Sequence, residues 1–154
     1  MVSELNTSMR EVDKMKIVPF VSVGEVRFGD SSEQVKAVLG GPNSSTCKGN
    51  STSNWYGDIE VTFRDDIVVD IGVAYPQEVT LEGVDIFSDP QGWKKICDLD
   101  GEPKSSYGIV VLPKFGVSFS GIHDGNDSQR SVGAFRKGLW DAILPTMKPF
   151  EDYK

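Results

Sequence analysis

The sequence predicts an α+β domain in which antiparallel strands form the sheet and helices pack on one side of it. Two observations predict it. A strand-like alternation, a capped helix and a Gly-Pro stop occupy residues 24–42, and a similar stretch recurs at 83–103. Runs rich in Val, Ile and Phe follow each stretch. We expect two approximate strand-helix-hairpin repeats; chance similarity of two such units is the alternative.

The expected boundaries follow from these stretches. Residues 1–18 carry alternating charges without an apolar stripe, which favours a flexible N-terminal tail. Residues 19–150 are expected to form one domain, with repeats at 19–76 and 79–148.

The first repeat contains the clearest helix signal. Val26 and Phe28 alternate with polar residues, as in a half-buried strand. Ser31 and Gln34 have the spacing of a capping box, which predicts a helix over 31–39. Residues 42–54 are rich in Ser, Asn, Thr and Gly, so we expect a long flexible loop there.

The strongest strand signal covers residues 55–75. Polar residues that include Glu60 and Asp70 should face water, and Asp65-Asp66 should form the turn of a hairpin. The apolar residues expected on the opposite face are Ile59, Val61, Phe63, Ile67, Val69, Ile71 and Val73.

The second repeat is predicted from weaker signals. We expect a strand at 79–87, a helix at 90–99 and a hairpin at 107–122 that turns at Pro113-Lys114. Residues 123–127 have turn composition. Beyond them we expect a last strand that ends at Arg136 and a short helix over 138–144.

Composition limits the function classes. The 154 residues carry a formal charge of −7, which disfavours nucleic acid and favours a basic partner; an ordinary acidic surface is the alternative. The apolar runs are too short to span a membrane, and the N-terminus has no signal-peptide pattern. Cys47 and Cys97 are expected to be free thiols, so we expect a cytoplasmic protein.

A search for catalytic chemistry finds little. The single histidine, His123, lies in a turn-like segment, and one histidine with two distant cysteines does not make a usual zinc site. Leu39-Gly-Gly-Pro42 follows a helix, whereas a phosphate-binding loop precedes one. Acidic residues are so numerous that chance pairs are unavoidable. We therefore expect no enzyme, no cofactor and no metal.

What remains is a surface suited to binding a protein. Carboxylates on the solvent-exposed face of the first hairpin and aromatic residues at strand ends suit an interface. The simpler interpretations are that the carboxylates are merely solvated and that the aromatic residues lie at the edge of the core. The candidate partner-binding residues are Glu60, Asp65, Asp66, Asp70, Tyr75 and Asp85.

Two segments carry a resemblance to known families. They read Val-Gly-Glu-Val-Arg-Phe-Gly-Asp-Ser-Ser-Glu-Gln-Val-Lys-Ala-Val-Leu-Gly-Gly-Pro (23–42) and Trp-Tyr-Gly-Asp-Ile-Glu-Val-Thr-Phe-Arg-Asp-Asp-Ile-Val-Val-Asp-Ile-Gly-Val (55–73). The pattern resembles the repeats of the β-lactamase inhibitory protein type and of the small lipoprotein of outer-membrane protein assembly. The whole chain resembles immunity proteins of bacterial polymorphic toxins, including contact-dependent growth-inhibition systems.

The resemblance implies a binding sheet without catalytic residues. Its leading functional implication is an immunity protein that holds a cognate toxin domain, often a nuclease, and blocks its active site. The alternative is a non-catalytic scaffold or envelope-assembly module that binds another folded protein.

Overall fold

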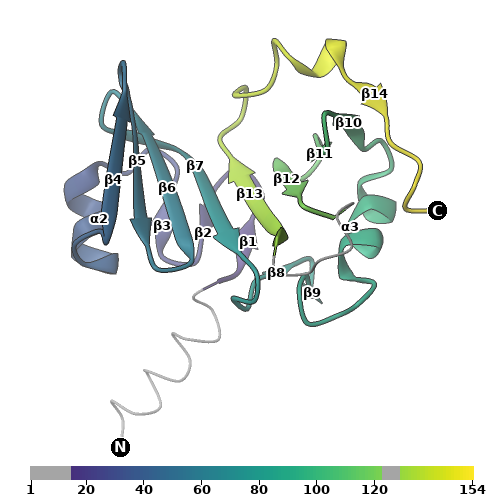
Figure 1. Cartoon of the computed structure of the whole chain (residues 1–154), viewed down its shortest axis with the longest axis horizontal. Coiled ribbons are helices and arrows are strands. Elements are labelled where there is room, and N and C mark those ends of the chain that lie inside the picture. The colour runs from purple at the N-terminus through teal and green to yellow at the C-terminus, as the bar shows by residue number, and fades with distance from the viewer. Residues whose placement is uncertain (1–14, 123–128) are drawn as a thin grey trace, which may run out of the picture.

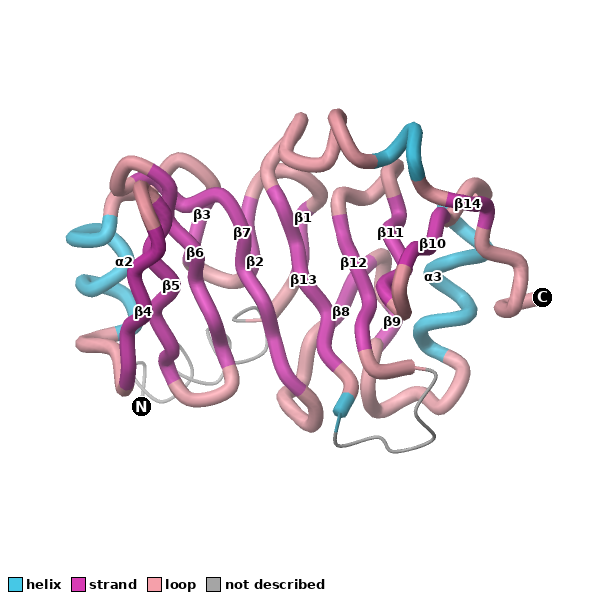
Figure 2. The backbone as a smooth tube through the Cα atoms, turned by 45° about the horizontal axis from the view of Figure 1, so that its top comes forward, coloured by secondary structure: helices cyan, strands magenta, loops and turns pink. Residues whose placement is uncertain are grey.

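The computed structural model describes residues 15–122 and 129–154, and a nine-stranded antiparallel sheet dominates it. Figure 2 shows these strands side by side across the molecule. In spatial order they are β14 (Lys148–Pro149), β10 (Lys104–Ser106), β11 (Ile109–Leu112), β12 (Val117–Ser120), β13 (Ser131–Phe135), β7 (Ile67–Ala74), β6 (Ile59–Arg64), β5 (Ser51–Tyr56) and β4 (Ser44–Lys48).

The remaining elements are short. Two small sheets accompany the large one, together with two α-helices and one 3₁₀ helix in the described residues. They are β1 (Ile17–Val18), β2 (Ser22–Val23) and β3 (Val26–Arg27); β8 (Thr80–Leu81) and β9 (Val84–Asp85); α2 (Ser32–Leu39) and α3 (Gly92–Asp100); and η2 (Leu144–Thr146). The α+β prediction is confirmed at this coarse level.

One apolar cluster joins the large sheet to both helices. Val35 of α2 and Ile96 of α3 are fully buried in it, together with Val61, Ile71 and Phe119 of the sheet. Burial of this apolar surface is the main force that holds the helices and small hairpins against the sheet. Figure 1 places α2 and α3 at opposite ends of the molecule.

Local chemistry explains α2. The side chain of Ser31 accepts a bond from the N–H of Gln34 at 3.3 Å, and the side chain of Gln34 accepts one from the N–H of Ser31 at 2.8 Å. Both bonds satisfy first-turn donors that have no partner inside the helix. The capping box predicted from these two residues is therefore confirmed.

The expected loop at 42–54 is wrong, because β4 and most of β5 occupy it. The five residues of β4 are all exposed, so the strand has no apolar alternation that a sequence pattern could reveal. Backbone pairing to β5 defines it, with a cross-strand bond of 2.6 Å from Ser45 Oγ to Asn54 Oδ1. In the same way β10, which pairs with β11, was not predicted.

A bulge corrects the predicted face of the first hairpin. The β6–β7 register shifts between Thr62 and Phe63, so that Phe63 lies opposite Val68 while Thr62 lies opposite Asp70. Because Val69 is an additional residue in β7, the residues before it point to the opposite faces of the sheet from those that strict alternation predicts. Val68 therefore enters the core, and Ile67 is 39% exposed instead of buried.

Three further expectations need correction. Met15 and Ile17 are buried, so the domain begins before residue 19. The strand expected at 79–87 is instead the tight hairpin β8–β9, whose turn places Glu82 and Gly83 at positive φ. The helix expected at 138–144 consists of turns that lead into η2, and Gly138 has a φ of 90° that a helix does not contain.

The turn expected at 123–127 lies outside the described residues.

Asp100 joins the end of α3 to the turn between β11 and β12. Its carboxylate accepts the backbone N–H of Lys114 at 2.9 Å and that of Glu102 at 3.2 Å, and the residue is 8% exposed. Burial raises the pKa of this carboxyl, and the backbone N–H groups oppose the rise.

We predict that Asp100→Ala lowers the free energy of unfolding by about 2–3 kcal/mol, because buried backbone donors lose their acceptor. Asp100→Asn, which keeps one side-chain carbonyl oxygen, should cost less. Urea denaturation of both variants measures the difference. An alanine variant as stable as the parent would contradict the role given to Asp100.

Candidate functional site

One face of the large sheet is turned away from the helices. Its residues alternate with the core residues of the same strands. In its central part they are half-buried, apart from the exposed Trp55, whereas Val111 and Phe135 of the same face are buried. We call it the open face, and its central residues are Ser53, Trp55, Glu60, Thr62, Asp70, Gly72, Ser118, Ser131 and Gly133. Most are small and polar, so the backbone of the sheet is accessible between a few larger side chains.

Two glycines lie opposite each other at the centre of this face. Gly72 of β7 pairs with Gly133 of β13, Glu60 of β6 lies next to Gly72, and Ser118 of β12 lies next to Gly133. A Cβ atom placed on Gly72 would lie 3.9 Å from Glu60 Oε1. One placed on Gly133 would lie 2.9 Å from Ser118 Oγ, too close to be tolerated without a shift, and 3.5 Å from Asp70 Oδ1. Both carboxylates therefore border the bare glycine pair.

Asp70 is the electrostatically unusual group of the open face. Burial, with a smaller contribution from the negative charge of Glu60, raises its pKa to about 7, and a hydrogen bond to the backbone of Ile71 opposes part of the shift. Among the described residues, no basic side chain forms an ion pair with either carboxylate. A carboxylate in this position is poised to accept a donor or a cation from outside the chain.

A second apolar cluster explains the burial of Asp70. Phe135, its direct neighbour on β13, is 3% exposed and packs with Val111 and Met147. The ring of Trp140 lies 5.9 Å from that of Phe135. Residues 136–147, which run from β13 toward β14 along one side of the sheet, supply part of this cluster (Figures 1 and 2). The cluster leaves Glu60 and Asp70 at the border between apolar and polar surface.

The predicted site residues separate into groups. Glu60 and Asp70 come together on the open face as expected. Asp65 and Asp66 form the tight turn between β6 and β7, with φ of 52° and 64°. Both are exposed, and the backbone N–H of Asp65 donates to the carbonyl oxygen of Asn50 at 3.1 Å. They lie at the end of the hairpin, beyond the bulge that separates them from Asp70.

Tyr75 and Asp85 do not join the carboxylate pair. The ring of Tyr75 packs edge-to-face against Phe87, with centroids 5.7 Å apart, and its peptide bond to Pro76 is cis. The carboxylate of Asp85 accepts the backbone N–H of Ser88 at 3.0 Å, in the segment that leads into α3. Both residues have structural roles that account for their positions.

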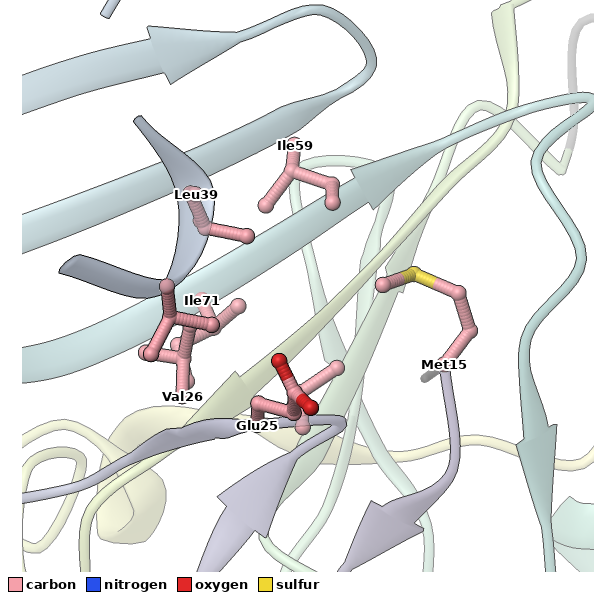
Figure 3. A pocket seen from close by; sticks show the side chains of 8 residues that line it. Met15, Glu25, Val26, Leu39, Ile59 and Ile71 are labelled. Atoms are coloured by element: carbon pink, nitrogen blue, oxygen red, sulfur yellow. The ribbon is translucent and has the colours of Figure 1, made fainter. Parts of the chain in front are cut away.

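Two cavities within the described part of the chain lie away from these carboxylates. A space of about 10 Å³ is lined by Met15, Val23, Glu25, Val26, Val38, Leu39, Ile59 and Ile71 (Figure 3). It can hold one water molecule at most. A neighbouring surface hollow of about 270 Å³ at the end of α2 shares Val38, Leu39 and Ile59 with it. Of its polar side chains, Asn43 already accepts the N–H of Gly57 at 2.5 Å, and the hydroxyl of Tyr56 accepts the side-chain N–H of Asn54 at 3.3 Å.

Other chemistry in the described residues is limited. No group of three or more His, Cys, Asp or Glu side chains lies close enough together there to bind a metal ion. Cys47 is exposed on β4, while Cys97 is buried in α3 and burial raises the pKa of its thiol to about 12. The helices within residues 15–122 and 129–154 are too short to cross a membrane.

The sequence did not indicate the residues that surround Glu60 and Asp70 on the open face. Gly72, Gly133 and Ser118 come from three strands, and their meeting depends on the pairing of β7 with β13. Alternation within the first hairpin correctly placed Glu60 and Asp70 on one face. No local signal indicates that a glycine of one strand lies opposite a glycine about 60 residues later.

Comparisons with known proteins do not identify a family. No protein-family model and no curated protein matches the chain. A solved structure of a cysteine-rich secretory protein from Staphylococcus aureus aligns with a TM-score of 0.43 and 9% sequence identity. The alignment covers 91% of this chain and 54% of that one, so the chain spans about half of that protein's length. Similarity at this level assigns neither fold nor function.

The raised pKa of Asp70 predicts a specific pH dependence of stability. Because the folded-state pKa lies above the ordinary value of 3.8, the folded state retains a proton that the unfolded state loses, and stability falls between about pH 4 and 7. We predict that Asp70→Asn removes this fall and raises the free energy of unfolding at pH 8 by about 2–4 kcal/mol.

Urea denaturation between pH 4 and 8 tests this, with Asp66→Asn as the exposed control. The control should keep the pH profile of the parent chain. Parallel profiles for Asp70→Asn and the parent would show that Asp70 ionises normally.

Proposed function

We propose that this chain is an immunity protein of the bacterial polymorphic-toxin type, which binds a cognate toxin domain through the open face and blocks its active site. The observation that carries the proposal is Asp70, a half-buried carboxylate on an accessible sheet face without a basic partner among the described residues. Such a group destabilises the fold when it is ionised, so its position is best explained by a partner that stabilises it.

The chemistry of the open face supports a protein partner. It combines an exposed aromatic side chain, Trp55, with small polar residues and two carboxylates, whereas a small-molecule site is usually a deep apolar pocket. The formal charge of −7 would accelerate association with a basic protein. A nuclease toxin is such a protein, because a nuclease must bind phosphate. The proposal assigns no catalytic step to this chain.

We also infer that the two halves of the chain are repeats. The order of elements supports this: α2 precedes β4–β7, and α3 precedes β10–β13, with a short hairpin before each helix. The two sets of strands meet in the antiparallel β7–β13 pair, whose central position is Gly72 opposite Gly133. Under this proposal the binding site lies where the repeats join, and neither repeat contains it alone.

The two cysteines suit the cytoplasm, which we propose as the site of action. Both are free thiols, and the exposed Cys47 is not protected from oxidation by burial. An immunity protein of this kind must meet the toxin after the toxin has entered the cell.

Co-expression with the protein encoded immediately upstream of this gene tests the proposed function. We expect growth to be restored by this chain and a one-to-one complex to be recovered from the cells. A toxic neighbour that this chain neither binds nor neutralises would contradict the immunity assignment. A complex with a non-toxic folded protein would favour the scaffold alternative.

We predict different kinetic effects for two matched double variants in that complex. Glu60→Gln/Asp70→Asn should accelerate dissociation at least about tenfold, because charge-assisted hydrogen bonds at a desolvated site are lost. Asp65→Asn/Asp66→Asn, which removes the same charge at an exposed turn that asparagine tolerates, should mainly slow association and reduce its salt dependence.

Stopped-flow and surface plasmon resonance measurements separate the two rate constants. If both double variants change the dissociation rate equally, the open face does not contribute more than the exposed turn to holding the complex together. Unchanged kinetics of the Asp65→Asn/Asp66→Asn variant would remove the turn from the interface.

A further inference from the structure

We propose that the open face receives one Lys or Arg side chain of the partner protein above Gly72, with its cationic group between Glu60 and Asp70. This inference rests on the proposed function, because it names the partner group that the same face binds. Four features of the structure carry it: the missing side chains, the positions of the carboxylates, the absence of a described internal cation, and the adjacent indole.

The first feature is the space. One cross-strand row reads Trp55, Glu60, Gly72, Gly133 and Ser118, so its second and fifth members flank two positions without side chains. A Cβ atom on Gly72 would meet its nearest atoms only at 3.8–3.9 Å, which is ordinary van der Waals contact. A side chain from outside can therefore reach the backbone of the sheet at Gly72, whereas the hydroxyl of Ser118 lies over Gly133, 2.9 Å from the position of a Cβ atom.

The second feature is the arrangement of charge around that space. Glu60 reaches toward Gly72 from β6, and Asp70 reaches from β7 toward Gly133. A guanidinium or ammonium group between them would approach both carboxylates at once. Hydrogen bonds between ionised groups are about twice as strong as neutral ones, and an Arg can engage carboxylate oxygens in pairs.

The third feature is that the chain itself supplies no cation there within its described residues. The residues that face Asp70 are Thr62 and Glu60 from β6, Phe135 and Gly133 from β13, and Ser118 from β12. Glu60 is the one charged group among them, and its charge has the same sign. An external cation would relieve both the repulsion between the carboxylates and the cost of burying Asp70.

The fourth feature selects an amino-acid side chain over a metal ion. Trp55 lies directly opposite Glu60 and is 37% exposed, so its indole can pack against the aliphatic stem that precedes the charge. Two carboxylates, with the hydroxyls of Thr62 and Ser118 nearby, fall short of the three or more His, Cys, Asp or Glu side chains that would indicate a metal site, and no such group lies within the described residues. A Lys or Arg side chain uses both the apolar and the charged part of this surface.

The binding should be linked to proton release. Asp70 is about half protonated near pH 7 in the free chain, since burial and Glu60 raise its pKa to about 7. A bound cation stabilises the ionised form and lowers that pKa. The affinity for the cationic side chain should therefore increase as pH rises from 6 to 8, and binding at pH 7 should release a fraction of one proton.

A model ligand tests the inference on the full chain alone. We would titrate N-acetyl-arginine methylamide into isotopically labelled protein at pH 7.5 and record the backbone amides and the side-chain carboxyl carbons by NMR. The expected shifts centre on Glu60, Asp70, Gly72 and Gly133, with an affinity on the order of millimolar for a single side chain. The same ligand should lower the pKa of Asp70 by about half a unit or more.

Matched controls decide the outcome. N-acetyl-citrulline methylamide, which has nearly the same shape without the charge, should leave these signals unchanged. Glu60→Gln/Asp70→Asn should weaken arginine binding about tenfold or more, whereas Asp65→Asn/Asp66→Asn should retain it. Gly72→Ala should fold, because a Cβ atom there would have no neighbour closer than 3.8 Å, and it should weaken binding by filling part of the space.

Several results would overturn the inference: equal shifts with citrulline, shifts centred on the Asp65-Asp66 turn, or no shift of Gly72 and Gly133 at saturating ligand. A stronger response of the same residues to CaCl2 or MgCl2 than to the arginine ligand would assign the site to a metal ion instead. None of these results depends on a toxin. If the chain neutralises a toxin but does not bind the arginine ligand, the proposed function stands and the inferred Lys or Arg site is wrong. If it binds the arginine ligand but neutralises no toxin, the site stands and the proposed function is wrong.

Discussion

The structure depends on the pairing of β7 with β13. Five residue pairs, from Ser131–Ala74 to Phe135–Asp70, join two runs of consecutive antiparallel strands into one sheet. Without this pairing both runs would end in unpaired strand edges, and the apolar side chains of Ile71, Val73 and Val132 would lose the common core in which they are buried. The same register brings two glycines face to face and places a carboxylate beside an aromatic ring. Stability and the candidate site therefore have one origin.

That register also imposes a local cost. Phe135 is well placed for the second apolar cluster, yet its cross-strand neighbour is Asp70, whose ionised form is disfavoured by the loss of water. A polar but neutral residue at position 70 would fit the same backbone without this conflict. Asp100 is also buried and also has a raised pKa, but it accepts backbone N–H groups on several sides and joins α3 to a turn. The contrast separates a carboxylate that serves the fold from one that the fold alone does not explain.

The predictable parts of the fold are those with local causes. The capping box of Ser31 and Gln34, the alternation in β6, and the Asp65-Asp66 turn all act within a few residues, and each was found from the sequence. The polar hairpin β4–β5 was missed because its strands are held by backbone pairing and hydroxyl contacts without an apolar face. The bulge at Val69 was missed because Ile67, Val68 and Val69 are consecutive apolar residues, so the apolar pattern does not show which of them is the additional residue. For the candidate site, Glu60 and Asp70 were predictable as one hairpin face, whereas Gly133, Ser118 and Phe135 required the long-range topology.

Carboxyl footprinting of the complex with the proposed partner protein tests the central claim, that the partner covers the open face. Carbodiimide labelling, read by mass spectrometry, compares Glu60 and Asp70 on that face with the exposed Glu33 of α2 and Asp98 of α3 on the helix-covered side. The account predicts that complex formation protects Glu60 and Asp70 while Glu33 and Asp98 remain reactive. Protection of the two helix residues, with Glu60 and Asp70 still labelled as in the free chain, would contradict it.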